Sequence, residues 1–66
     1  MISLVKIRME RRLTQKDLAD LLNISRSTVA MWETGRSSPK RKDIKTIAKT
    51  LNISVDEILD CFDRYE

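Results

Sequence analysis

The sequence predicts a single compact all-α domain of five short helices, and three observations support this fold class. Its 66 residues suffice for one small domain, residues 1–66, and no more. Helix-capping residues flanked by apolar residues occur three times, directly before residues 15, 26 and 55. Apolar residues recur at helical spacing along the predicted segments. The expected helices are 1–11, 15–22, 26–34, 41–51 and 55–60.

The first predicted helix is indicated by its apolar spacing and its basic end. Leu4 and Ile7 recur at helical spacing, and Arg8 lies on the same side as Leu4. Arg11 and Arg12 follow at the end of the segment, where positive charge suits the negative terminus of a helix.

The second predicted helix begins with a capping box. Thr14 is a suitable N-cap because its hydroxyl can accept a hydrogen bond from the free backbone N–H groups of the first turn. Asp17 follows three residues later, where its carboxylate can reach back and favours the positive helix end. Leu13 and Leu18 flank the cap as a hydrophobic staple. The side facing the core is expected to carry Leu18, Ala19 and Leu22.

The third predicted helix follows after only three residues and starts in the same way. Ser25 is its cap, and Ile24 and Val29 form the staple. Asn23 tolerates the left-handed conformation that a sharp turn needs, and Gly35 ends the helix. Two short helices with so short a connection form a helix-turn-helix motif.

The last two predicted helices carry similar signals. Asn52 ends the fourth helix as a C-cap. Ser54 with Glu57 predicts a full capping box at the start of the fifth helix, and Ile53 with Ile58 predicts its staple. The core positions of the fourth helix are Ile44, Ile47, Ala48 and Leu51.

Composition excludes several classes of protein. A single cysteine, Cys61, fits a reducing cytoplasm better than a disulfide scaffold. No apolar run approaches the ~20 residues needed to cross a bilayer, and no secretory pattern opens the chain, so we expect a soluble cytoplasmic protein without a membrane partner. The chain has no histidine, no metal-site spacing and no paired carboxylates typical of acid–base catalysis, so we expect neither an enzyme nor a cofactor.

The net charge of +3 is distributed unevenly. Residues 1–54 carry 12 Lys or Arg and 5 Asp or Glu, whereas residues 55–66 carry one Arg and five acidic residues. A basic body with an acidic end is expected if one face meets a polyanion. A solvated charged surface explains the charge alone equally well.

A set of residues at fixed spacing carries a family resemblance: Leu13, Thr14, Gln15, Leu18, Ala19, Leu22, Asn23, Ile24, Ser25, Val29, Trp32, Glu33, Gly35 and Pro39. This stretch resembles the helix-turn-helix proteins of the phage repressor and Cro type, and the similarity extends upstream to Arg8 and downstream to residue 59. The resemblance implies a five-helix domain like that of lambda repressor, which binds double-stranded DNA. The family usually has glycine where Arg12 stands, so either the turn differs or the arginine is retained for its charge.

In such proteins the second helix of the motif lies in the major groove and presents its N-terminal residues to base edges. Arg26 is the main candidate for base recognition, because a guanidinium can bond guanine O6 and N7 together; a phosphate contact alone is the alternative. Ser27 can donate or accept a hydrogen bond with a base or a phosphate. Ala30 and Met31 offer apolar surface for a thymine methyl group, although Met31 can equally fill a gap in the core.

Cations after the third predicted helix are candidates for phosphate contacts. Residues 40–42 place three positive charges at the start of the fourth helix, where the helix dipole disfavours them. A bound phosphate would remove this conflict, and solvated surface side chains are the alternative. The predicted phosphate contacts are Gln15, Thr28, Arg36, Lys40, Arg41 and Lys42.

Arg8 and Glu33 are expected to have a structural role. In the resembling family an arginine at this position pairs with the glutamate that precedes the glycine, which links the first helix to the third. A glutamate on a DNA-facing surface would repel phosphates, so an inward, paired Glu33 is expected.

The C-terminal part carries the predicted dimer interface. Val55, Leu59, Phe62 and Tyr65 could form an apolar patch through which a twofold homodimer places two recognition helices about 34 Å apart. The same residues could instead cover the domain's own core. We prefer the dimer because one small domain contacts few bases.

Together these features predict a sequence-specific regulator of transcription that binds double-stranded DNA and represses by occupying its operator. With no sensor module in the sequence, it would block RNA polymerase or contact it directly. The alternative is a protein-interaction module such as an antitoxin, whose acidic end and Phe62 bind a basic partner. A co-purifying partner, or weak DNA binding with little salt dependence, would favour this alternative.

Overall fold

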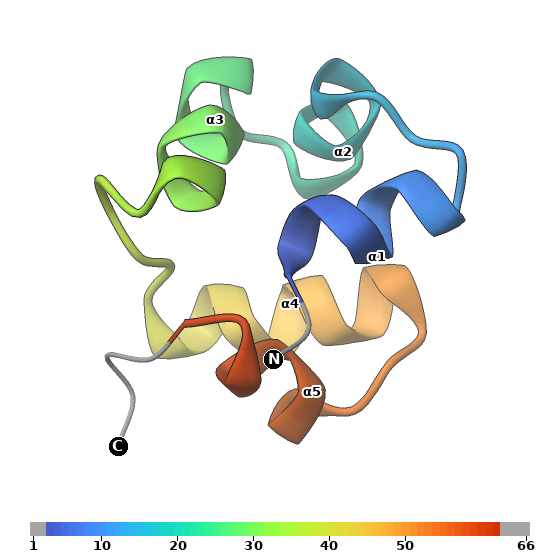
Figure 1. The fold of residues 1–66 in the computed structure, drawn as a ribbon, viewed down its shortest axis with the longest axis vertical. Helices are drawn as coiled ribbons and strands as arrows, with labels where there is room; N and C mark the ends of the chain where they lie inside the picture. Colours follow the sequence, from blue (N-terminus) through green and yellow to red (C-terminus); the bar gives the residue numbers. More distant parts are fainter. Residues whose placement is uncertain (1–2, 63–66) are drawn as a thin grey trace.

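The computed structural model describes residues 3–62, which form five α-helices and no β-strand (Figure 1). The predicted all-α fold is confirmed, and four of the five helices have the predicted bounds. The helices are α1 (Leu4–Glu10), α2 (Gln15–Leu22), α3 (Arg26–Thr34), α4 (Arg41–Leu51) and α5 (Val55–Asp60).

The first helix is shorter than predicted. It begins at Leu4 because Ser3 caps it, with the Ser3 hydroxyl accepting a hydrogen bond from the backbone N–H of Lys6 at 3.1 Å. Its C-cap is Arg11, so it is one residue shorter at that end as well. The serine before Leu4 is the same kind of N-cap residue that precedes three later helices, and it places the start of α1 more accurately than the apolar spacing does.

The caps of the helix-turn-helix pair form as predicted. The Thr14 hydroxyl accepts from the Asp17 backbone N–H at 3.0 Å, and the Asp17 carboxylate accepts from the Thr14 N–H at 2.9 Å. The Ser25 hydroxyl accepts from the Thr28 N–H at 3.2 Å. These bonds satisfy donors that helix geometry leaves free, and they determine where α2 and α3 begin.

The predicted full capping box of α5 is only half formed. The Ser54 hydroxyl accepts from the Glu57 N–H at 3.1 Å, but the Glu57 carboxylate accepts from the same hydroxyl at 3.3 Å instead of from the Ser54 backbone. The reciprocal bond is replaced because the hydroxyl can donate as well as accept.

Residues in the left-handed conformation directly follow α2, α3 and α4, where the turns between helices begin. Asn23 and Asn52 have φ of 58° and 56°, and Gly35 has φ of 79°. Arg12 adopts the same region, with φ of 57°. The turn after α1 therefore keeps the geometry that suits glycine, and the first of the two explanations for Arg12, a different turn, is wrong.

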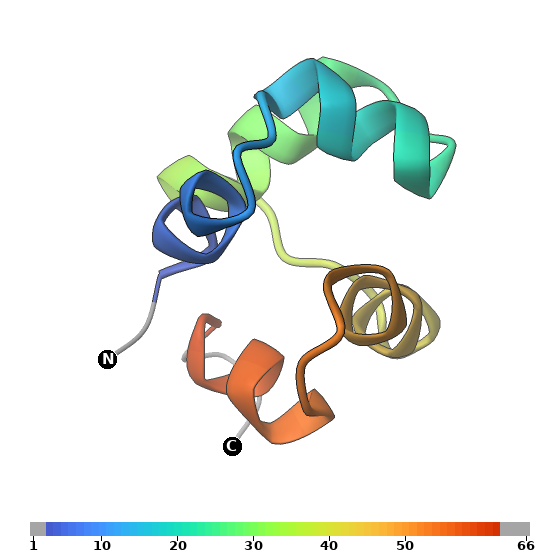
Figure 2. The same ribbon diagram turned by 90° about the vertical axis from the view of Figure 1, so that its right-hand side faces the viewer.

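The helix-turn-helix pair occupies one end of a molecule that measures 28 × 23 × 20 Å. In Figure 2, α2 and α3 lie at the top, α1 and α4 lie in the middle, and α5 lies at the bottom. The pair is in extensive mutual contact, and α2 also packs on α4, while α5 packs mainly on α4.

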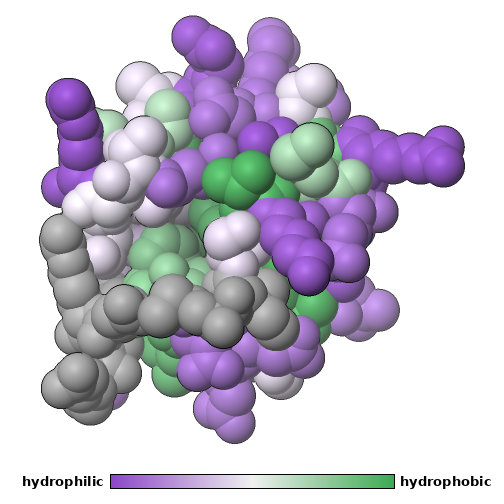
Figure 3. Space-filling model, in the orientation of Figure 1, coloured by the Kyte–Doolittle hydropathy of each residue, from purple (hydrophilic) through white to green (hydrophobic). Residues whose placement is uncertain are grey.

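One hydrophobic core holds these helices together. Val29 and Trp32 from α3 pack in it with Leu18 from α2. Hydrophilic side chains lie along most of the edge of the molecule in the view of Figure 3. Each large buried side chain contributes on the order of 2 kcal/mol through the hydrophobic effect. The buried apolar residues are Leu4, Ile7, Leu18, Ala19, Val29, Trp32, Ile44, Ile47, Ala48, Leu51, Ile58 and Phe62.

Candidate nucleic-acid interface

The outer side of α3 presents the residues predicted to contact bases. Arg26 and Ser27, in its first turn, are exposed, and Ala30 is half-buried. Met31 is 39% exposed. Met31 is therefore available to a partner and does not serve only to fill the core, while Val29 and Trp32 on the opposite side attach the helix to the domain.

Hydroxyl groups cluster at the start of α3. The Ser25 hydroxyl lies 3.1 Å from the Ser27 hydroxyl and 2.8 Å from the Thr28 hydroxyl. Ser27 is exposed, so it can exchange this neighbour for an external group. Thr28 is half-buried, and its hydroxyl is hydrogen-bonded to the hydroxyl of the Ser25 cap.

Gln15 is the first residue of α2 and is held by α3. Its side-chain amide donates a hydrogen bond to the Glu33 carboxylate at 2.9 Å. Because a carboxylate only accepts, this bond fixes which end of the amide faces inward and leaves the second N–H of the NH₂ group for another acceptor. The backbone N–H of Gln15 is one of the first-turn donors that a helix leaves without an intrahelical partner.

The four predicted phosphate-contacting cations that follow α3 are all exposed: Arg36, Lys40, Arg41 and Lys42. No ion pair involves them within residues 3–62. Asp43 reduces the conflict between these charges and the helix dipole, because its carboxylate accepts from the Lys40 backbone N–H at 3.3 Å. A net positive charge nevertheless remains at the start of α4.

The predicted ion pair between Arg8 and Glu33 is present in the structure. Arg8 Nε lies 2.7 Å from Glu33 Oε2, and the two side chains are only 12% and 5% exposed. Arg8 also donates from Nη1 to the Leu13 carbonyl oxygen at 2.7 Å. With the Gln15 bond, these contacts form a polar network that joins α1, the turn before α2, α2 and α3 (Arg8, Leu13, Gln15 and Glu33).

The sequence does not predict the Arg8 bond to the Leu13 carbonyl oxygen or the Gln15 bond to Glu33. It also does not predict a further bond, which Arg11 makes. The Arg11 side chain donates from Nε to the Leu51 carbonyl oxygen at 2.6 Å, so it caps the C-terminal end of α4. The two residues are 40 positions apart in the sequence, and no local sequence pattern predicts such a pair.

The predicted dimer interface is only partly available on the surface. Phe62 is 6% exposed and belongs to the domain's own core, because it packs with the buried residues of the other helices. Leu59 is half-buried against the same core, whereas Val55 is 39% exposed. Tyr65 lies outside the described residues. For Phe62 the structure therefore fits the alternative, in which these residues cover the domain's own core.

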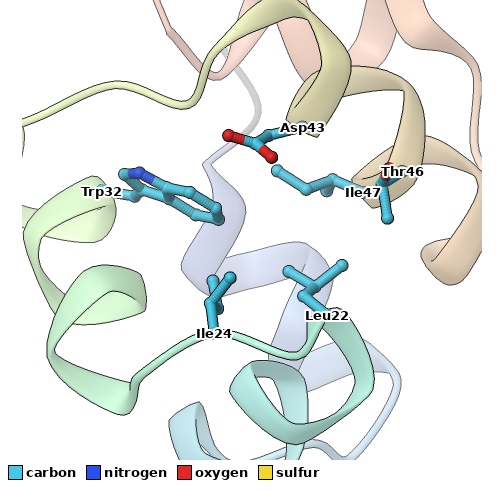
Figure 4. Close-up of a pocket in the computed structure, with 6 residues that line it drawn as sticks. All are labelled: Leu22, Ile24, Trp32, Asp43, Thr46 and Ile47. Carbon is cyan, nitrogen blue, oxygen red and sulfur yellow. The ribbon is translucent and has the colours of Figure 1, made fainter.

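A small pocket lies between the turn of the motif and α4 (Figure 4). Its volume of about 10 Å³ is comparable to the space of one water molecule, so it does not suit an organic ligand. The lining residues are Leu22, Ile24, Trp32, Asp43, Thr46 and Ile47.

Cys61 lies outside this pocket. Burial raises the pKa of its thiol above the ordinary value, and the nearby carboxylates of Asp60 and Glu57 add to this effect, so the group is a poor nucleophile.

Comparison with known proteins identifies the family. A model of the helix-turn-helix family matches residues 4–58, which is most of the chain and includes all five helices except the end of α5. The chain belongs to the helix-turn-helix family. The predicted resemblance to repressors of the phage type is thereby confirmed, and the relatives that match include a transcriptional activator and an immunity repressor.

Three curated helix-turn-helix relatives illustrate the match. The chain is 36% identical over 56 residues to the HTH-type transcriptional activator BcrR of Enterococcus faecalis, covering 85% of this chain and 28% of that protein. It is 42% identical over 53 residues to the immunity repressor protein of Bacillus phage phi105, covering 80% of this chain and 37% of that protein. It is 35% identical over 57 residues to the uncharacterized HTH-type transcriptional regulator YqaE of Bacillus subtilis, covering 86% of this chain and 49% of that protein.

The chain thus spans less than half the length of each of these relatives. No solved structure matches it significantly. Among residues 3–62, none of the helices has the length and apolar character required to span a membrane.

Proposed function

We propose that this domain binds double-stranded DNA in a sequence-specific manner and regulates transcription. The observation that carries this proposal is the outer side of α3, where Arg26 and Ser27 stand exposed at the N-terminal end that such helices present to bases. Arg26 is proposed to bond a guanine, and Ala30 with Met31 to contact a thymine methyl group.

Phosphate contacts are proposed on both sides of α3. The exposed cations at Arg36 and residues 40–42 would bind the DNA backbone after α3, and Gln15 would bind it before α3. Thr28 remains in the proposed set, although its hydroxyl already has a partner in the Ser25 cap. These contacts would supply affinity that does not depend on sequence and falls with salt.

We further propose that the domain acts as a homodimer and represses by occupying its site. One small domain reaches few base pairs, so a second copy would provide the specificity that a regulator needs. Exposed Val55 and part of Leu59 are the proposed dimer contacts. Among the relatives, one is named as an immunity repressor and another as a transcriptional activator, so the reporter measurement below decides between repression and activation.

The test is selection of bound sequences from random duplex DNA, with the mass of the free protein measured in solution. We expect an enriched inverted repeat with half-sites about one helical turn apart, and a dimeric mass. The selected site is then placed over a reporter promoter, where co-expression of the protein should lower the output. A folded protein that enriches no motif would contradict the proposal of specific DNA binding.

A further inference from the structure

The two arginines that follow α1 have different surroundings. Arg11 uses its side chain inside the domain, where it donates to the Leu51 carbonyl oxygen at 2.6 Å. Arg12 donates only from its backbone, to the Met9 carbonyl oxygen at 2.9 Å. Its side chain is exposed and has no hydrogen bond or ion pair within residues 3–62. The fold therefore makes use of Arg11 but not of the Arg12 guanidinium.

The backbone of Arg12 also has an unfavourable conformation. Its φ is positive, at 57°, and in the described part of the chain only Asn23, Asn52 and Gly35 also have a positive φ. Asparagine and glycine adopt this region with little strain, whereas a long side chain with a full Cβ substituent does not. A residue that strains the turn and forms no internal side-chain contact is not explained by stability, and such strain tends to occur at functional positions.

The position of Arg12 relative to the proposed DNA-binding surface is fixed. The backbone N–H of Leu13 donates to the Arg8 carbonyl oxygen at 3.1 Å, and Arg8 Nη1 donates to the Leu13 carbonyl oxygen at 2.7 Å. Arg8 in turn is paired with Glu33 of α3, so the turn is attached to α3. In Figure 1 this turn leads directly into α2, and the Cα atoms of Arg12 and Gln15 can be at most about 11 Å apart.

We propose that Arg12 binds a phosphate of the DNA backbone next to the start of α2, beyond the contacts assigned to Gln15. A guanidinium suits this role because it can form two parallel hydrogen bonds to one phosphate. The turn would then hold Arg12 in a strained conformation in exchange for an additional contact to DNA. This inference rests on the proposed function, because it requires that the domain bind DNA.

The test compares Arg12→Gly with the unchanged chain in two measurements. Thermal unfolding should show a midpoint raised by about 2–6 °C, since glycine relieves the strain. Binding to a random 30-base-pair duplex is then titrated at several salt concentrations. The slope of log affinity against log salt should fall by about 0.9, and the affinity at low salt should fall several-fold, because one phosphate contact is lost.

Three further variants separate charge from backbone strain. Arg12→Asn, which tolerates the left-handed conformation without charge, should lose the same salt slope as Arg12→Gly. Arg12→Lys should keep both the slope of log affinity against log salt and the backbone strain, because lysine retains the charge and a full side chain. Lys6→Gln removes an exposed cation near the other end of α1 and should leave the slope unchanged.

Each outcome bears on either this inference or the proposed function. An unchanged slope in Arg12→Gly, while Lys40→Ala lowers it, would refute the role of Arg12 and leave the DNA-binding proposal intact. A lower unfolding midpoint in Arg12→Gly would also contradict the inference, because the side chain would then stabilise the fold. Absence of salt-dependent binding by the unchanged chain would instead refute the proposed function.

Discussion

At the scale of single residues, Glu33 is the residue whose surroundings matter most. It is a carboxylate that is 5% exposed beneath a surface proposed to bind an anion, and it receives hydrogen bonds from both Arg8 and Gln15. A buried charge is tolerated when it is paired and its oxygen atoms are satisfied. The network meets both conditions, with Nε and Nη2 of Arg8 at 2.7 and 3.4 Å from the two carboxylate oxygens.

Arg8→Met should therefore destabilise the domain strongly, because it leaves the Glu33 charge without a partner. We expect a loss of about 3 kcal/mol in the free energy of unfolding, which corresponds to a midpoint lower by roughly 15 °C. Thermal unfolding followed by circular dichroism measures this. The control is the double variant Arg8→Met with Glu33→Leu, which should be more stable than Arg8→Met alone. A single variant as stable as the unchanged chain would show that the pair is dispensable.

Arg26 should behave differently, since it is exposed and its side chain has no ion pair within residues 3–62. Arg26→Ala should cost about 1–3 kcal/mol of binding free energy on the selected DNA site and relax the preference at one base position. Its unfolding midpoint should stay close to that of the unchanged chain. Competition binding against duplexes with single base changes measures the effect. Equal losses on selected and random DNA would restrict Arg26 to a phosphate contact.

At the scale of helices, caps determine where each element begins, and one of them is sensitive to pH. The backbone N–H of Thr14, and then its side chain, hold the pKa of the Asp17 carboxyl below its ordinary value of 3.8. The charged form is thus favoured by folding. Its contribution to stability is complete above the unfolded pKa and is lost as pH falls through the folded pKa.

Asp17→Asn should accordingly lower the unfolding midpoint at pH 7, since asparagine keeps an acceptor but loses the charge at the start of α2. The difference between the variant and the unchanged chain should shrink as pH falls below about 3.8, because Asp17 is protonated first in the unfolded chain and, at still lower pH, in the folded chain as well. Unfolding midpoints recorded from pH 7 to pH 2 measure it. Asp20→Asn is a suitable comparison, because its partner Lys16 is an exposed surface residue and such pairs contribute little. A difference that is constant with pH would exclude Asp17 ionisation as the cause.

At the scale of the whole molecule, the uneven charge predicts how DNA binding responds to salt. Lys40→Ala should weaken binding to all duplexes about equally and lower the slope of log affinity against log salt by about 0.9. The residue is exposed at the start of α4, and its side chain has no ion pair within the described residues. Titrations on selected and random DNA give both quantities. A loss confined to the selected site would indicate that Lys40 contacts a base.

The sequence predicted what depends on neighbouring residues. The bounds of α2 to α5 follow from caps and turn residues within four positions of each boundary, and the core side of α4 follows from its apolar spacing. Contacts between distant residues were accessible only where a family resemblance supplied them, as for Arg8 and Glu33. The Arg11 bond to Leu51 and the Gln15 bond to Glu33 depend on how helices pack, which local spacing does not encode. The burial of Phe62 in the core depends on helix packing in the same way.

The ion pair of Arg8 with Glu33 also makes the electrostatics of the surface depend on the docking of α1. While α1 is in place, the Glu33 carboxylate is neutralised and covered. If α1 detaches, the same carboxylate becomes an uncompensated negative charge beside the first residue of α2, where a phosphate is proposed to bind. A copy with α1 detached would therefore bind a phosphate at the start of α2 more weakly than an intact copy does.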